Sequence, residues 1–135
     1  MAGMTSDSRQ LSALIHRPPE EVYQYAAVPA NLPEWAPGLG TSVEQVDGQW
    51  FAETSMGRVG FAFAPRNTYG VLDHEVTLPS GAVISNPMRV TRNGSGSEVV
   101  FSLRRNPGMT DEEFHRDAGL VAADLARLKA RVEAR

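Results

Sequence analysis

Apolar and polar residues alternate with helical spacing near both ends of the chain and with strand spacing between them. An apolar stretch at residues 11–16 stops at Pro18 and Pro19. Proline lacks the N–H that a strand ladder needs but suits the first turn of a helix, so a strand gives way to a helix here. The spacing predicts a helix over 20–27, with Val22, Tyr25 and Ala26 on one face. Asn31 is placed to cap a second, shorter helix over 32–35.

Turn signals at hairpin spacing divide residues 41–105. They are Asp-Gly at 47–48, Met-Gly at 56–57, Pro-Ser-Gly at 79–81 and Asn-Gly-Ser-Gly at 93–96. Asp-Gly is among the strongest two-residue hairpin signals. No helical segment interrupts the runs, so they predict a meander of antiparallel strands. The six predicted strands are 41–46, 49–55, 58–64, 69–78, 82–92 and 97–105.

Pairing across these turns predicts which side chains share a face of the sheet. A two-residue turn at 56–57 pairs Ala52 with Phe61 and Trp50 with Phe63. A three-residue loop at 79–81, with Gly81 in the left-handed conformation, pairs Val76 with Ile84, His74 with Asn86 and Leu72 with Met88. The predicted inner face is mostly apolar: Trp50, Phe61, Phe63, Leu72, Val76, Ile84, Met88, Phe101 and Leu103. Its polar positions are Gln45, Thr54, His74 and Asn86.

The last segment predicts one long amphipathic helix. Thr110 and Glu113 have the spacing of a capping box. A single apolar stripe follows: Phe114, Ala118, Val121, Leu125, Leu128 and Val132. This stripe must be buried, and the sheet is its largest available partner. The expected fold is α+β: a seven-stranded curved antiparallel sheet around a long C-terminal helix, with two short helices after the first strand. Residues 9–135 are expected to form one domain, and residues 1–8 a flexible N-terminus.

Composition narrows the function classes. The 135 residues carry a net charge of −3 and no cysteine. A negative chain is poorly suited to phosphate neutralisation, so no nucleic-acid partner is expected. No apolar run approaches about 18 residues, which predicts no membrane span and a cytoplasmic protein. The three histidines lack the spacings of metal ligands, so neither a metal site nor a cofactor is expected.

Two N-terminal motifs resemble a known superfamily. Residues 14–23 (LIHRPPEEVY) are similar to the strand-then-"PxEVW/Y" start of the helix-grip, or SRPBCC, proteins, and residues 31–38 (NLPEWAPG) to their "NLPxWxP" second helix. The superfamily includes START lipid-transfer domains, birch-pollen allergens and polyketide cyclase-like proteins, and this chain resembles its bacterial-type members. The resemblance implies the helix-grip fold over nearly the whole chain. It leaves several activities open, because members bind lipids, hormones or polyketides, catalyse cyclisation, or regulate partners.

A curved sheet gripping a helix is expected to enclose an apolar ligand cavity. The candidate ligand-binding residues are Trp35, Trp50, Phe61, Phe63, His74, Asn86, Met88, Phe101, Val121 and Leu125. His74 has three possible roles. It pairs with Asn86 to orient a ligand, it is the candidate catalytic acid/base, or it is a structural residue bonded to Asn86. Asp117 and Asp124 either reach the cavity edge and meet His74 or lie on the solvated flank of the helix. Trp35 is either a lid over the cavity or a core residue.

The favoured function is binding of a small hydrophobic ligand that is lipid-, polyketide- or hormone-like. One alternative is an enzyme resembling the polyketide cyclases and aromatases, with His74 as acid/base. A second is a regulatory interaction protein whose cavity is filled. Binding is favoured over catalysis because a single histidine without an evident carboxylate partner is a weak basis for acid–base catalysis. The chain is expected to be a monomer or homodimer whose partner is a small hydrophobic molecule.

Overall fold

The computed structural model describes residues 6–38 and 40–135. The predicted flexible N-terminus includes residues 1–5, which lie outside the described residues. In chain order the elements are β1 (Ser8–Ile15), α1 (Pro19–Ala26), a single 3₁₀ turn η1 (Pro29–Asn31), α2 (Leu32–Trp35), β2 (Ser42–Val46), β3 (Gln49–Thr54), β4 (Gly57–Phe63), β5 (His74–Thr77), β6 (Val83–Asn86), β7 (Met88–Asn93), β8 (Gly96–Arg104) and α3 (Asp111–Glu133).

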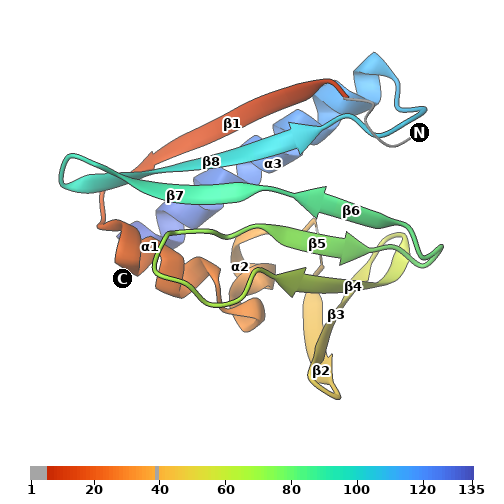
Figure 1. Ribbon diagram of the computed structural model, residues 1–135, viewed down its shortest axis with the longest axis horizontal. Coiled ribbons are helices and arrows are strands. Elements are labelled where there is room, and N and C mark those ends of the chain that lie inside the picture. The colour runs from red at the N-terminus through yellow and green to blue at the C-terminus, as the bar shows by residue number, and fades with distance from the viewer. Residues whose placement is uncertain (1–5, 39) are drawn as a thin grey trace.

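The strands form two antiparallel sheets, and α3 runs behind the sheet of β1, β8 and β7 (Figure 1). The smaller sheet has the order β1-β8-β7, and the larger has the order β2-β3-β4-β5-β6. Residues 70–72, which precede β5, join the two sheets: the Leu72 N–H donates to the Met88 carbonyl at 2.8 Å, and the Val90 N–H donates to the Gly70 carbonyl at 3.0 Å. The α+β helix-grip fold with a long C-terminal helix is therefore confirmed.

The described strands number eight rather than the expected seven, because the segment predicted as one strand over 82–92 is broken at Pro87. Proline has no N–H to give to a ladder. The next amide, that of Met88, donates at 2.9 Å to the Asp73 carboxylate instead of to a strand. The predicted strand 69–78 is correspondingly reduced to β5, with one isolated bridge between Val71 and Arg89.

The observed hairpin registers test the residue pairs that were predicted across the turns. Around the 79–81 loop, Val76 pairs with Ile84 and His74 with Asn86, as predicted. Around the earlier turn the prediction was wrong: Ala52 pairs with Val59 and Trp50 with Phe61, so the turn residues are 55–56. Thr54 Oγ1 fixes this turn by accepting from the Met56 N–H and donating to the Gly57 carbonyl. The shift is two residues, which leaves every side chain on its predicted face.

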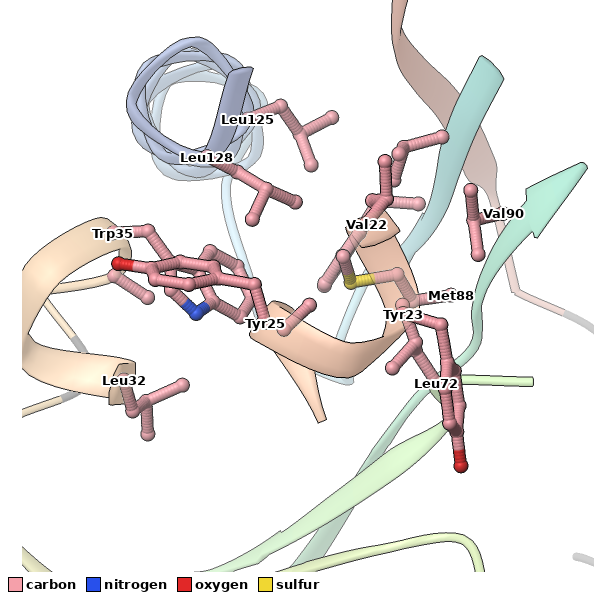
Figure 2. Packing of buried hydrophobic residues seen from close by; sticks show 14 of the residues in the cluster. Val22, Tyr23, Tyr25, Leu32, Trp35, Leu72, Met88, Val90, Leu125 and Leu128 are labelled. Atoms are coloured by element: carbon pink, nitrogen blue, oxygen red, sulfur yellow. The ribbon is translucent and has the colours of Figure 1, made fainter. Parts of the chain in front are cut away.

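The core lies between α3, the two sheets and the short helices. Ala118, Leu125, Leu128 and Val132 of the predicted stripe are buried. Figure 2 shows Leu125 and Leu128 projecting from α3 into a cluster that includes Val22 and Trp35. The capping box of Thr110 and Glu113 is present in both directions, which confirms that prediction. The face of α1 that carries Val22, Tyr25 and Ala26 is buried, also as predicted.

Asn31 does not cap α2 with its side chain, so that expectation was wrong. The residue stands at the N-cap position but has helical backbone angles, and its Nδ2 donates to the Tyr25 carbonyl at 3.0 Å. A capping side chain needs an extended backbone to reach the following amides. Asn31 instead ties α2 back to the end of α1, which fixes the position of Trp35 relative to the core.

Candidate functional site

A cavity of about 400 Å³ lies between α2, α3 and the inner faces of β5, β6 and β8. We call it the grip cavity. Six of the predicted ligand-binding residues line it: Trp35, His74, Asn86, Phe101, Val121 and Leu125. His74, Asn86 and Phe101 come from alternating strand positions, Val121 and Leu125 from the α3 stripe, and Trp35 from α2. Its volume is in the range of small-molecule sites.

The other four predicted residues lie outside the grip cavity. Trp50, Phe61 and Phe63 border a separate hollow of about 770 Å³. That hollow also takes in Arg58 and Glu75 from the opposite face of the sheet, so it follows a sheet surface rather than entering the core. Met88 has no exposed surface and packs among core residues (Figure 2). Ligand binding by any of the ten residues remains a prediction.

The inner-face aromatic rings form a continuous row that ends in the grip cavity. Ring centroids are 6.2 Å apart between Trp50 and Phe61, 6.4 Å between Phe61 and Phe63, and 5.3 Å between Phe63 and His74. The last step, from His74 to Phe101, is 5.9 Å. These spacings fall in the range of favourable tilted and edge contacts. The row holds the His74 ring between two phenylalanines.

His74 is buried, and its ring is held by the backbone rather than by Asn86. The Nδ1 atom lies 3.0 Å from the Leu72 carbonyl. A carbonyl oxygen can only accept, so Nδ1 carries the proton and Nε2 is the bare, accepting nitrogen. Asn86 pairs with His74 along the strand ladder, but no side-chain bond joins them in the described part of the chain, so the expected His–Asn bond was wrong. Burial lowers the pKa of His74, and the Leu72 bond and the nearby Asp73 oppose that shift only in part.

We expect His74 to be neutral at pH 7 and to titrate below the ordinary histidine pKa of 6.5. The unfolded chain then binds the proton more readily than the folded chain. The contribution of His74 to stability therefore falls as the pH drops from about 6.5 toward its folded pKa. NMR titration of the ring protons, assigned with a His74→Gln variant, measures this pKa. A value above 6.5 would show that an acidic partner reaches the ring.

Two carboxylates from α3, Asp117 and Asp124, also line the grip cavity. Asp124 is mostly buried and accepts from Arg127 Nη1 at 2.8 Å. Burial raises its pKa to about 6, and the Arg127 pair offsets this only in part. Burial likewise raises the pKa of Asp117. Neither carboxylate bonds to His74 among the residues the structure describes, so both line the cavity edge without forming the His–Asp pair.

Asp124→Asn tests the buried charge. Between the ordinary pKa of 3.8 and about 6, the folded chain holds the Asp124 proton more tightly than the unfolded chain. Its stabilising contribution is therefore present at low pH and is lost as the pH rises through about 6. We expect the variant to gain up to about 2 kcal/mol relative to wild type between pH ~4 and pH ~7.5. Urea unfolding at both values measures the gain, and a difference independent of pH would contradict the assignment.

Trp35 is a core residue as well as part of the cavity wall. Its side chain is 3% exposed, and its Nε1 is buried without a hydrogen-bond partner in the segments 6–38 and 40–135. A surface lid would keep much more of the ring accessible, so the core position holds. In Figure 2 the Trp35 ring is drawn below Leu128, inside the buried cluster.

The sequence interpretation did not assign several cavity residues as site residues. They are Leu32 of α2, Ala36 at its C-cap, and Val76, Ile84 and Leu103 of the sheets. The strand residues carried a usable signal, because all three were predicted on the inner face. The α2 residues had none, because their contribution depends on where that helix docks. Over the described stretches, no three His, Asp or Glu side chains converge closely enough to hold a metal ion.

The fold and the cavity together define an α+β helix-grip protein. The sequence matches the family described as "Polyketide cyclase / dehydrase and lipid transport" over residues 8–133. The chain belongs to this family, and the resemblance to the SRPBCC superfamily is confirmed. No curated protein matches the sequence. Within the described part of the chain, no helix is both long and apolar enough to cross a membrane.

Solved structures show the same fold at low sequence identity. The protein XoxI from Bacillus cereus is 18% identical with a TM-score of 0.70, and the alignment covers 96% of each chain. Ara h 8.0201 is 13% identical with a TM-score of 0.64, over 96% of this chain and 99% of that one. The Aha1 dimer from Colwellia psychrerythraea is 17% identical with a TM-score of 0.70, over 94% and 96%.

Proposed function

We propose that this protein binds a small hydrophobic molecule in the grip cavity. The observation that carries the proposal is the cavity itself: about 400 Å³, walled mostly by apolar side chains, with polar lining residues that include His74, Asn86, Asp117 and Asp124. A largely apolar hollow with a few converging polar groups is the usual form of a ligand site. Membership of a family described by polyketide chemistry and lipid transport supports the same function.

The volume also argues against the alternative of a filled cavity. The bulky inner side chains Trp50, Phe61 and Phe63 pack along the aromatic row and leave the space between β5, β6 and α3 unoccupied. Filled cores leave few voids larger than a water molecule.

A neutral fluorescent probe, N-phenyl-1-naphthylamine, tests the proposal. We expect one probe to bind per chain, with enhanced probe fluorescence and quenching of tryptophan emission from Trp35. Val121→Trp places a large side chain in the cavity and should abolish binding, whereas Ala122→Trp, at an exposed position of α3 outside the cavity wall, should leave it unchanged. Equal probe affinity in the two folded variants would place binding elsewhere.

A second candidate, proton-transfer catalysis, is favoured by one specific arrangement. His74 presents an unprotonated Nε2, and Asp124 is a carboxyl with a raised pKa, and both line the same cavity. Environments that move two pKa values in opposite directions are typical of acid–base pairs. If His74 transfers protons, it should accelerate the exchange of the α-protons of bound 2-tetralone for solvent deuterium. NMR measures this exchange rate. A rate equal in wild type and His74→Phe would remove this candidate.

A further inference from the structure

We propose that the grip cavity selects aromatic ligands that carry a neutral hydroxyl group and discriminates against carboxylates, with His74 Nε2 accepting the hydroxyl proton in a hydrogen bond. The inference rests on the proposed ligand-binding function and deepens it by naming the ligand chemistry. It makes His74 a specificity-determining residue.

The first argument is the fixed hydrogen-bonding role of His74. Its Nδ1 proton is committed to the Leu72 carbonyl, so the ring presents only an acceptor to the cavity. Nε2 has no partner among residues 6–38 and 40–135, although the residue is 6% exposed. Nε2 is not fully buried, because Trp35 Nε1 is the one fully buried side-chain polar atom without a partner among these residues, so Nε2 can accept from a bound ligand. A hydroxyl satisfies this nitrogen, whereas a carbonyl, an ether or a carboxylate has no proton to donate.

The second argument is the charge along the α3 side of the cavity. Asp117 and Asp124 both line it, so a ligand carboxylate would lie near two groups of its own charge. Asp124 already has a cation partner in Arg127, so it does not require a positive ligand. Arg104 also lines the cavity, but its side chain is exposed, and an ion pair there would be weak. The charge of Asp117 and Asp124 therefore disfavours an anionic ligand.

The third argument is the aromatic wall. His74 and Phe101 line the cavity with ring centroids 5.9 Å apart, and Phe63 lies 5.3 Å behind His74. Ring faces and edges at these positions offer offset-stacked and edge contacts to a planar ligand. An aliphatic chain would bury apolar surface against the same wall but would make no stacked or edge contacts between rings. A hydroxyl on a ring thus matches both the wall and the acceptor.

Four naphthalenes of nearly equal size test the inference on the wild-type chain at pH ~7.5, where a phenol is neutral, a carboxylic acid is ionised and Asp124 is mostly ionised. They are naphthalene, 2-naphthol, 2-methoxynaphthalene and 2-naphthoate. Isothermal titration calorimetry or probe displacement gives their dissociation constants. We expect 2-naphthol to bind about 3–10-fold more tightly than 2-methoxynaphthalene, the worth of one hydrogen bond. We expect 2-naphthoate to bind at least about tenfold more weakly than 2-naphthol.

The matched variant is His74→Phe, which keeps an aromatic ring and removes the acceptor. In this variant 2-naphthol should lose its advantage over 2-methoxynaphthalene, while naphthalene binds at least as well as in wild type. Asp117→Asn should selectively strengthen 2-naphthoate binding. Equal affinities for 2-naphthol and 2-methoxynaphthalene in wild type would overturn the inference without any variant. A hydroxyl advantage that survives in folded His74→Phe would overturn the role of His74.

The neutral probe keeps the two proposals separate. Binding of N-phenyl-1-naphthylamine that Val121→Trp removes, without discrimination among the naphthalenes, would leave the binding function intact and overturn only the selectivity. Absence of both probe and naphthalene binding would overturn the binding function and the selectivity together.

Discussion

Replacing Leu125 with alanine is expected to lower the free energy of unfolding by about 2–4 kcal/mol, because the side chain is removed from a well-packed core. Leu125 is 2% exposed and lies on the α3 stripe beside Leu128, which is fully buried. The loss comprises the lost burial of three carbons and the enlarged void beside the grip cavity. Leu128→Ala, which does not border the cavity, should lie toward the upper part of the range.

Leu120→Ala is the matched control, since this leucine is on the same helix and 57% exposed. Its effect should stay within about 0.5 kcal/mol, as is usual for surface substitutions. Urea unfolding followed by circular dichroism measures all three variants. A loss below about 0.5 kcal/mol for Leu125→Ala would separate the helix stripe from the core and contradict the packing of α3.

Gly70→Ala is expected to destabilise the protein by about 3 kcal/mol or more, for two additive reasons. Gly70 has φ +73°, a conformation that side chains rarely adopt, and an added Cβ would lie 2.1 Å from the Val90 carbonyl oxygen. That carbonyl is backbone of β7, at the junction of the two sheets, so it cannot move without disturbing the pairing of residues 70–72.

Gly48→Ala separates these two causes. Gly48 has nearly the same φ, +80°, but an added Cβ meets nothing within 4 Å. Only the backbone strain should remain, about 1–2 kcal/mol. Thermal and urea unfolding of both variants give the difference. Equal losses in the two variants would mean that the β7 contact contributes nothing and that the sheets are joined more loosely than their hydrogen bonds indicate.

The alternation of side chains predicted the faces of the sheet even where the register was wrong. The turn at 55–56 differs from the prediction by two residues in pairing, and a shift of two preserves the face. The break at Pro87 could have been predicted from the sequence, because proline is excluded from central strand ladders. The prediction of one strand over 82–92 instead followed the apolar residues on either side of Pro87. The capture of the Met88 amide by Asp73 depends on a side-chain contact that no strand pattern encodes.

The sequence predicted an apolar cavity on the inner face of the sheet, but not which part of that face lines it. The inner face could be read from strand alternation, and His74 was found because it interrupts an apolar run. Which part of that face remains open depends on where α2 and α3 dock. The pattern of residues along the chain does not specify those positions. This is why Trp50 and Phe61 lie outside the grip cavity while Leu32 lines it. The tautomer of His74 likewise follows from a backbone carbonyl two residues away.

The interruption at Pro87 also has a mechanical consequence. The sheet of β1, β8 and β7 carries α3 along its length, whereas β5 and β6 of the other sheet provide the opposite wall of the grip cavity. The two walls are joined through the short 70–72 segment, the Asp73 bonds to Met88 and Arg89, and the Ser102 N–H, which donates to the Pro87 carbonyl at 2.9 Å. Bending at this junction would widen or narrow the cavity while leaving the regular ladders within each sheet intact. His74 belongs to the last β5–β6 pair before the break, so the residue proposed to contact the ligand lies on the wall next to this junction.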